Sequence, residues 1–337
     1  MTRSGFCILL LISLVACTQI PAPTVTPSPV PSSTPTLTPT STLTPTSIPP
    51  TVTFVPSITP TTGPKSLVPN FDHIVMITFE NKEFGSVIGN PTMPNYNKLA
   101  REYTLLTQYY AIRHPSLPNY LALMGGDTFG VDNDCHKCFV DSPSLPDLIE
   151  ASGRTWRAYQ EDMPEPCFIG DTDLYVQKHN PFIYFDPIRL NTQRCEGSVV
   201  PLTALETDIE ADTLPNFVYI TPNLCNDSHD CSLDIADAWL TNLLATLVPA
   251  LDATGDSYLV VMMFEEGQGD HTCCGLPEPG GGRVPVVLYS PLVKNGFEDP
   301  TPYTHYSLLK TISAAWGLSY LGHAAEDSNV LITAPWK

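Results

Sequence analysis

The stretch HIVMITFE, residues 73–80, decides the expected fold. It is a short run of mostly apolar residues that ends in a carboxylate. Such a run is typical of a strand buried on both faces, as in a parallel sheet covered by helices. Four further stretches are also predicted to be strands: TWRAYQ (155–160), NFVYIT (216–221), SYLVVMMFEE (257–266) and VPVVLYS (284–290).

Longer segments with apolar residues at helical spacing separate these runs. The predicted helices are MPNYNKLAREY (93–103), SLPNYLALMGG (116–126), SLPDLIEAS (144–152), IADAWLTNLLATLVPALD (235–252) and HYSLLKTISAAWGL (305–318). The alternation of strand and helix predicts a three-layer α/β/α sandwich with a mostly parallel central sheet.

The first 64 residues predict export and a tether. Residues 1–16 resemble a bacterial lipoprotein signal peptide, because they contain one Arg and an apolar run and lead into Cys17 through the ending LVAC. This resemblance implies a lipid on Cys17. An uncleaved anchor or an ordinary signal peptide is the alternative. Residues 17–64 are rich in Pro, Thr and Ser, a composition typical of an extended stalk. We therefore expect residues 65–337 to form one domain, held at the cell membrane and facing outside the cytoplasm.

The chain is strongly acidic, with 35 Asp and Glu against 16 Lys and Arg. A surface of this charge argues against nucleic acid as a partner. It leaves a small phosphorylated substrate open, because a bound cation can reverse the field locally.

Eight cysteines follow Cys7 and Cys17, and an even number in an exported protein favours disulfides. Proximity in the sequence favours three pairs, with a zinc site built on CHKC (135–138) as the competing interpretation. The adjacent cysteines 273 and 274 are harder to place. The three favoured pairs are Cys135–Cys138, Cys167–Cys195 and Cys225–Cys231.

Carboxylates gather where two predicted strands end. Glu80 and Asn81 follow the first strand, and Glu265 and Glu266 follow a later one. Ligands of open α/β sheets bind beyond the carboxyl ends of strands. Adjacent carboxylates repel each other unless a cation or proton lies between them, and oxygen-rich clusters suit divalent cations. A solvated acidic loop is the alternative, but a site for a divalent metal ion is the more economical interpretation.

Ser116 stands at the predicted start of a helix, in HPSLPNYLALMGG (114–126). A serine there is most often an N-cap. The same backbone N–H groups favour phosphate, however, and a nearby cation would lower the pKa of the hydroxyl and make it a nucleophile. Both interpretations stay open from these residues alone.

Several histidines lie in predicted loops rather than in apolar helices. Any one of them has an ordinary loop role by default, but together they could contact phosphate, protonate a leaving group or bind a metal. They are His114, His179, His229 and His271.

The chain resembles the bacterial and fungal phosphoesterase family across nearly all of residues 70–320. That family contains acid phosphatases and phospholipases C and is related to the alkaline phosphatase superfamily. The resemblance implies an alkaline-phosphatase-like sandwich and identifies residues 65–337 as a phosphoesterase catalytic domain. The matching motifs are HIVMITFEN, HPSLPNYLALMGGDTFGV, KHNPF, NDSHDCS and FEEGQGDHTCCG.

The resemblance also implies roles for single residues. Glu80, Glu265 and Glu266 would bind the metal together with Ser116, the nucleophile. Asn81 would lie near the phosphate. At position 265 the family more usually has Asp, so the extra methylene of Glu265 could shift this ligand.

Three histidines match family positions that contact the phosphoryl group or protonate the leaving alcohol: His114, His179 and His229. Asp270 and His271 receive only a weak supporting role.

The resemblance predicts metal-dependent hydrolysis of phosphate monoesters through a phosphoserine at Ser116. A phosphodiesterase or phospholipase C that acts on lipid head groups is the alternative. A third possibility is a surface binding module without catalysis.

Overall fold

The computed structural model describes residues 67–337. The predicted signal peptide, the lipidated Cys17 and the stalk lie outside the described residues, and they stay predictions. Within the described part, no helix is long and apolar enough to cross a membrane.

The centre of the domain is a mostly parallel sheet with the strand order β5-β4-β6-β1-β7-β8-β2-β9. β1 lies between β6 and β7 and is parallel to both, whereas β8 is antiparallel to β7 and to β2. The strands are β1 (His73–Phe79), β2 (Thr104–Leu106), β4 (Trp156–Gln160), β5 (Val199–Pro201), β6 (Phe217–Thr221), β7 (Tyr258–Phe264), β8 (Val286–Tyr289) and β9 (Phe297–Asp299). A separate two-stranded ladder joins β3 (Tyr109–Tyr110) to β10 (Tyr303–Thr304).

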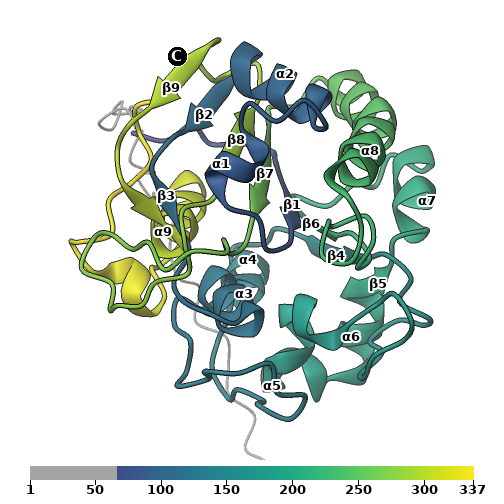
Figure 1. Ribbon diagram of the computed structural model, residues 1–337. Coiled ribbons are helices and arrows are strands. Elements are labelled where there is room, and N and C mark those ends of the chain that lie inside the picture. The colour runs from purple at the N-terminus through teal and green to yellow at the C-terminus, as the bar shows by residue number, and fades with distance from the viewer. Residues whose placement is uncertain (1–66) are drawn as a thin grey trace, which may run out of the picture. The chain divides into compact units, whose positions relative to one another are not determined.

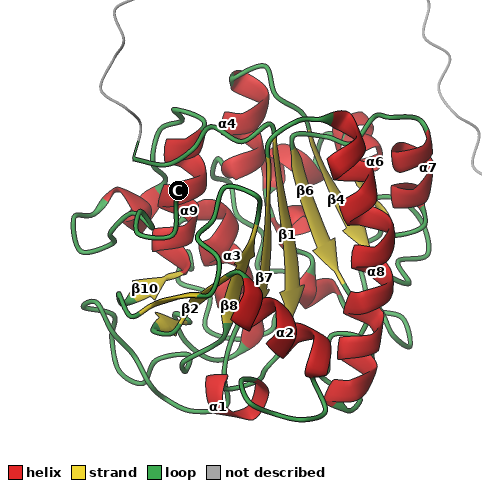
Figure 2. Ribbon diagram, turned by 90° about the horizontal axis from the view of Figure 1, so that it is seen from above, coloured by secondary structure: helices red, strands yellow, loops and turns green. Residues whose placement is uncertain are grey.

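Helices cover both faces of this sheet, which confirms the predicted sandwich (Figures 1 and 2). α2 and α8 pack together on one face, and α3, α4 and α9 lie on the other. The bounds of these helices are α2 (Pro94–Glu102), α3 (Ser116–Gly125), α4 (Leu145–Ala151), α8 (Leu233–Thr254) and α9 (His305–Ala315). The remaining helical segments are short: α1 (Phe84–Val87), α5 (Asp186–Arg189), α6 (Thr192–Ser198), α7 (Ala204–Glu210), and the 3₁₀ turns η1 (Gln177–His179), η2 (Pro181–Tyr184) and η3 (Gly322–Ala325).

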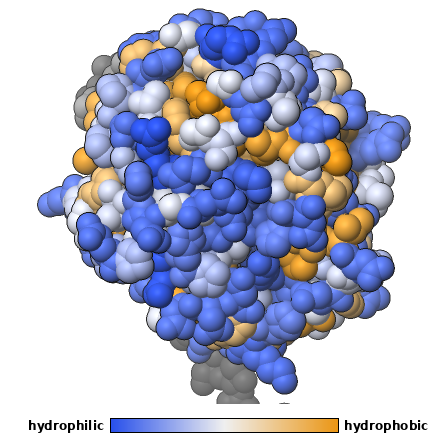
Figure 3. All heavy atoms as spheres, viewed as in Figure 1, coloured by the Kyte–Doolittle hydropathy of each residue, from blue (hydrophilic) through white to orange (hydrophobic). Residues whose placement is uncertain are grey.

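The core lies on both faces of the central sheet, because every residue of β1 and β7 is buried. This is the burial that their mostly apolar sequences predict. Hydrophilic residues cover most of the face seen in Figure 3, with hydrophobic ones in small patches.

All five predicted strands and all five predicted long helices are present, with ends that differ by a few residues. The short strands β2, β5 and β9 were not predicted. Each has only three residues, too few to give a periodic signal.

The N-terminus of α2 is capped by a side chain from another helix. Its own N-cap residue, Met93, offers no side-chain hydrogen bond. Asp237 of α8 is buried and accepts instead from the backbone N–H of Asn95 at 3.1 Å and of Tyr96 at 2.8 Å. The carboxylate thus satisfies two backbone donors that would otherwise be unpaired, and it joins α2 to α8.

We expect Asp237→Ala to lower the free energy of unfolding by about 2–4 kcal/mol, because it leaves buried N–H donors without a charged acceptor. Denaturant unfolding measures the loss. Asp234→Ala is the control, since Asp234 is exposed in the first turn of the same helix, and it should change stability by less than about 0.5 kcal/mol. Equal losses in the two variants would contradict the capping role.

Candidate active site

The register of β1 against β7 brings the predicted carboxylates together. Phe79 lies opposite Phe264, and the ladder continues with Glu265 N–H donating to Phe79 O at 3.0 Å. Glu80 and Glu265 therefore leave the sheet side by side. Both are completely buried, Glu266 is almost so, and one oxygen from each of the three carboxylates lies within 4.8 Å of the others.

The hydroxyl of Ser116 lies inside this cluster. It is 2.5 Å from Glu80 Oε1 and 3.1 Å from Glu266 Oε1. Ser116 is the first residue of α3, the N-cap position belongs to Pro115, and Pro115 has no side chain that could cap the helix. The capping interpretation of Ser116 is therefore wrong, and its oxygen is directed to the carboxylates instead.

Asn119 fixes the segment that leads into α3. Its Oδ1 accepts from the backbone N–H of Ile112 at 2.9 Å and of Arg113 at 3.2 Å. Its Nδ2 donates to Arg113 O at 2.6 Å and Pro115 O at 3.2 Å. One fully buried amide thus sets the path of the backbone before Ser116. The Asn in SLPNY was part of the motif, but its role could not be derived from it.

The amide of Leu117, the second residue of α3, is not free to bind phosphate. Leu117 N–H donates to Asp134 Oδ1 at 3.0 Å, and Lys178 Nζ pairs with Asp134 Oδ2 at 3.1 Å. The expectation that the helix N–H groups receive phosphate is therefore wrong for Leu117. Lys178 brings a cation close to the cluster instead, and Glu80 and Asp134 raise its pKa against the effect of burial.

His179 is held between two carboxylates. Its Nε2 is 3.1 Å from Glu80 Oε1, and its Nδ1 is 3.3 Å from Asp227 Oδ2. Burial alone would lower the pKa of His179, but the two carboxylates raise it to about 9. The ring is therefore protonated at neutral pH and has no nitrogen free.

His114 is held in a similar way on the other side of the serine. Its Nδ1 makes a short hydrogen bond to Glu266 Oε2, and its Nε2 lies 3.1 Å from Gly269 O. The bond to Glu266 raises the pKa of His114 to about 9, although burial opposes the shift. The structure thus brings two of the three predicted histidines against the carboxylates.

The three carboxylates differ in their preference for a proton. Burial and the adjacent Glu80 raise the pKa of Glu265 well above its ordinary range, and burial also raises the pKa of Glu266. Burial would raise the pKa of Glu80 as well, but the charge of His179 holds it below its ordinary range. Within these three carboxylates, Glu80 Oε2 and Glu265 Oε1 are buried without a hydrogen-bond partner among residues 67–337.

Asn81 sits at the end of β1 in the left-handed region, with φ of 49°. This conformation turns its backbone N–H toward Glu265, whose Oε2 accepts at 3.1 Å. Its side-chain oxygen is buried and has no hydrogen-bond partner in the described part of the chain. Asn81 therefore lies next to the cluster, and its place near the phosphate stays a prediction.

His305, at the start of α9, contacts the backbone carbonyl of Glu265. It was not predicted as a site residue. Its Nε2 lies 2.6 Å from Glu265 O and its Nδ1 lies 3.1 Å from Tyr109 OH. Burial lowers the pKa of His305 to about 4, so the ring is neutral. A neutral ring donates to the carbonyl and accepts from the tyrosine.

His229 lies on the loop that follows β6. Its Nδ1 is 2.7 Å from Asp230 Oδ1, and no hydrogen bond to its Nε2 occurs within residues 67–337. Its ring centre is 6.1 Å from that of His179. Of the three histidines that match family positions, His229 is thus the one with a nitrogen left for another partner.

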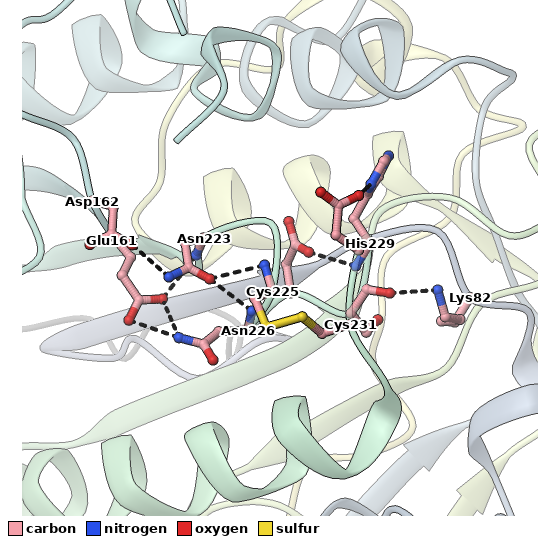
Figure 4. The surroundings of a disulfide bond; sticks show 11 residues. Lys82, Glu161, Asp162, Asn223, Cys225, Asn226, His229 and Cys231 are labelled. Atoms are coloured by element: carbon pink, nitrogen blue, oxygen red, sulfur yellow. Dashed lines mark hydrogen bonds and ion pairs between the residues drawn. A yellow bond between two sulfur atoms is a disulfide. The ribbon is translucent and has the colours of Figure 1, made fainter. Parts of the chain in front are cut away.

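Glu161, at the end of β4, anchors this loop from its other side (Figure 4). Its carboxylate accepts from Asn223 N–H at 2.9 Å, from Asn226 Nδ2 and from Trp239 Nε1. The loop also contains the disulfide Cys225–Cys231. Neither Glu161 nor Asp227 was predicted, because an acidic residue in a polar loop gives no distinctive signal.

The three predicted disulfides are confirmed, and Cys273 pairs with Cys274 as well. The zinc interpretation of CHKC is wrong, because Cys135 and Cys138 bond to each other.

Asp270 and His271 are exposed, and their side chains make no hydrogen bond to the described residues.

The fold defines a class of protein. A protein in the alkaline phosphatase superfamily from Vibrio parahaemolyticus has the same fold, with a TM-score of 0.52 and 12% identity over 80% of this chain and 71% of that chain. Residues 90–319 match the Phosphoesterase family, and the chain belongs to that family.

Two relatives illustrate the family's range. The chain is 36% identical to the phosphate-repressible acid phosphatase of Penicillium chrysogenum, over 81% of this chain and 65% of that protein. It is 31% identical to the phosphatidylinositol-3-phosphatase of Mycobacterium tuberculosis, over 77% of this chain and 81% of that protein. The chain spans a little under two thirds of the length of the fungal acid phosphatases that it matches.

We expect Glu161→Gln to loosen the loop after β6, because an amide cannot accept from all the donors that the carboxylate serves. Hydrogen exchange of residues 222–232 should quicken by about one to two orders of magnitude. Glu165→Gln is the control, since Glu165 is exposed nearby and makes no hydrogen bond through its side chain to the described residues. Unchanged exchange in Glu161→Gln would show that the disulfide holds the loop without Glu161.

Proposed function

We propose that this chain hydrolyses phosphate monoesters, with Ser116 as the nucleophile and a divalent cation held by Glu80, Glu265 and Glu266. One observation supports the proposal above all: a serine hydroxyl lies within a buried cluster of three carboxylates. A structural serine has no need of such neighbours, and a buried cluster of like charges is costly unless something neutralises it.

The donor set fits a hard or borderline divalent cation. All the atoms that converge are oxygens, from three carboxylates and one hydroxyl, which is the chemistry that such cations prefer. The buried oxygens Glu80 Oε2 and Glu265 Oε1 have unused acceptor capacity. A cation bound by these residues would lower the pKa of the Ser116 hydroxyl and offset negative charge on the phosphoryl oxygens.

The residues of the chain then have distinct tasks in the first half of the reaction. Ser116 loses its hydroxyl proton to solvent, Oγ attacks phosphorus, and a phosphoserine forms as the ester bond to the alcohol breaks. The protonated rings of His179 and His114 place positive charge on either side of the serine, where the transferring group gathers negative charge. Asn81 adds an amide beside Glu265.

His229 is the best placed to protonate the departing alcohol. Both nitrogens of His179 and of His114 are engaged with acceptors, whereas His229 keeps Nε2 free and has Nδ1 oriented by Asp230. This is the arrangement expected of a general acid. In the second half, a water molecule gives a proton to His229 and attacks phosphorus. The bond from phosphorus to Ser116 Oγ breaks, inorganic phosphate leaves, and Oγ regains a proton from solvent.

The names of the relatives favour monoesters over diesters. The acid phosphatases and the phosphatidylinositol-3-phosphatase are both named for removing a phosphate group, and they are 31–36% identical to this chain. The hemolytic phospholipase C of Pseudomonas aeruginosa is only 22% identical, over 39% of that protein. A phosphodiesterase or phospholipase C therefore ranks second.

We expect Ser116→Ala to lower kcat for 4-nitrophenyl phosphate by at least about a thousandfold, because the attacking oxygen is removed. During turnover by the unaltered protein, acid quenching and mass spectrometry should find one added phosphate on the peptide that contains Ser116. Ser198→Ala is the matched control and should keep the activity, since Ser198 lies at the end of α6, away from the cluster. Turnover of Ser116→Ala at the unaltered rate would sink the assignment.

We expect a divalent cation to raise the melting temperature after removal of metal by a chelator, because ligand binding to the folded state stabilises it by about 2.7 kcal/mol at a hundred times Kd. Glu265→Gln should abolish this rise. Without metal it should melt no lower than the unaltered protein, because it removes a buried group whose pKa burial raises. A full metal-dependent rise in Glu265→Gln would exclude Glu265 as a ligand, and Glu210→Gln on α7 is the control.

A further inference from the structure

A cleft of about 710 Å³ opens beside the candidate active site. His114 lines it, and the same ring contacts Glu266 of the carboxylate cluster. Ile112, Leu276 and Tyr306 give the cleft apolar walls. A phosphate ester bound at Ser116 therefore has a space next to it that is large enough for the alcohol part of a small substrate.

Arg113 brings a cation into the wall of this cleft. Its side chain is half-buried, and its Nε lies 3.3 Å from the carbonyl oxygen of His114. No carboxylate among residues 67–337 lies within ion-pair distance of its guanidinium, although acidic residues outnumber basic ones by more than two to one. Among the other described arginines, Arg157, Arg189 and Arg194 pair directly with carboxylates, whereas Arg101, Arg154 and Arg283 do not.

The backbone of Arg113 is fixed from two sides. Asn119 bonds both its N–H and its C=O. Gly281 packs against it so closely that an added Cβ would lie 2.7 Å from Arg113 O and 2.8 Å from Arg113 N. Ala111 N–H also donates to Gly282 O at 3.0 Å. The guanidinium thus projects from a rigid base, which lowers the entropy cost of holding a ligand.

The acidic residues of the cleft do not neutralise this arginine. Glu326 is exposed and bonds to His323, with Oε1 2.7 Å from the Nδ1 of that ring. Glu278 is exposed at the rim. The lining of the cleft therefore combines apolar side chains with the guanidinium of Arg113, which has no carboxylate within ion-pair distance in the described residues.

We propose that the cleft binds the alcohol part of the substrate and that Arg113 binds an anionic group on that part, either a carboxylate or a second phosphate. This rests on the proposed function, because it places the phosphoryl group at Ser116. The preferred substrates are then phosphate monoesters with a second anion a few atoms from the ester. The planar guanidinium suits both anions, since each accepts two parallel N–H donors.

Two matched pairs of substrates test the preference and distinguish the two anions. Glycerol 3-phosphate and 3-phosphoglycerate differ by a carboxylate, and fructose 6-phosphate and fructose 1,6-bisphosphate differ by a phosphate. Phosphate release gives kcat/KM for each. We expect a preference of about tenfold or more for the doubly anionic member of at least one pair, since a hydrogen bond to a charged group has this effect.

Arg113→Gln should lower kcat/KM for the preferred doubly anionic substrate about tenfold more than for its partner, and Arg113→Lys should restore part of the difference. Arg101→Gln, on α2, should leave the ratio unchanged. An equal loss on both members of the pair in Arg113→Gln would overturn the proposal, as would the absence of any preference in the unaltered protein. Hydrolysis of none of the four substrates, nor of 4-nitrophenyl phosphate, would instead overturn the proposed function itself.

Discussion

The repulsion between two buried carboxylates is the constraint on which the rest of the site depends. The parallel pairing of β1 and β7 places Glu80 directly beside Glu265, at the edge of a sheet that is buried on both faces. Neither side chain can turn to water, because both are fully covered. Like charges this close raise the pKa of one partner and need a neutralising group between them. The fold therefore creates a demand for positive charge at one defined point.

The surrounding polar groups neutralise part of this negative charge, and they do so to different extents for the three carboxylates. His179 and His114 lie against Glu80 and Glu266 and carry protons at neutral pH. The backbone of Asn81, turned by its positive φ, gives Glu265 a hydrogen bond but no charge. His305 is neutral, and its hydrogen bond to Glu265 is to the backbone carbonyl rather than to the carboxylate. Glu265 is thus the carboxylate with the least positive charge beside it, and a bound cation would stabilise its ionised form the most.

The sequence predicts this centre well because the relevant signal is local. An apolar run that ends in a carboxylate predicts a buried strand, and it also predicts that the carboxylate lies at the edge of the sheet. The positions of Glu80 and Glu265 could therefore be predicted from the sequence. Asp227 and Glu161 could not, since the carboxylates act through partners up to 78 residues away along the chain. The antiparallel direction of β8 also escaped prediction, because its apolar sequence suits either direction. The start of α3 shows the converse: a serine there favours a cap by propensity, yet Pro115 takes that position.

The glutamate at position 265 shows how the backbone and the ligand set depend on each other. An Asp there would draw both oxygens back toward β7 by about the length of one C–C bond, 1.5 Å. The longer side chain allows Oε2 to reach the amide of Asn81 at 3.1 Å while Oε1 stays buried in the cluster without a partner. That amide is available because Asn81 adopts a left-handed conformation, which Asn tolerates better than most residues. The length of the side chain and the turn after β1 therefore form one arrangement, so the extra methylene is accommodated at this site rather than displacing the carboxylate from it.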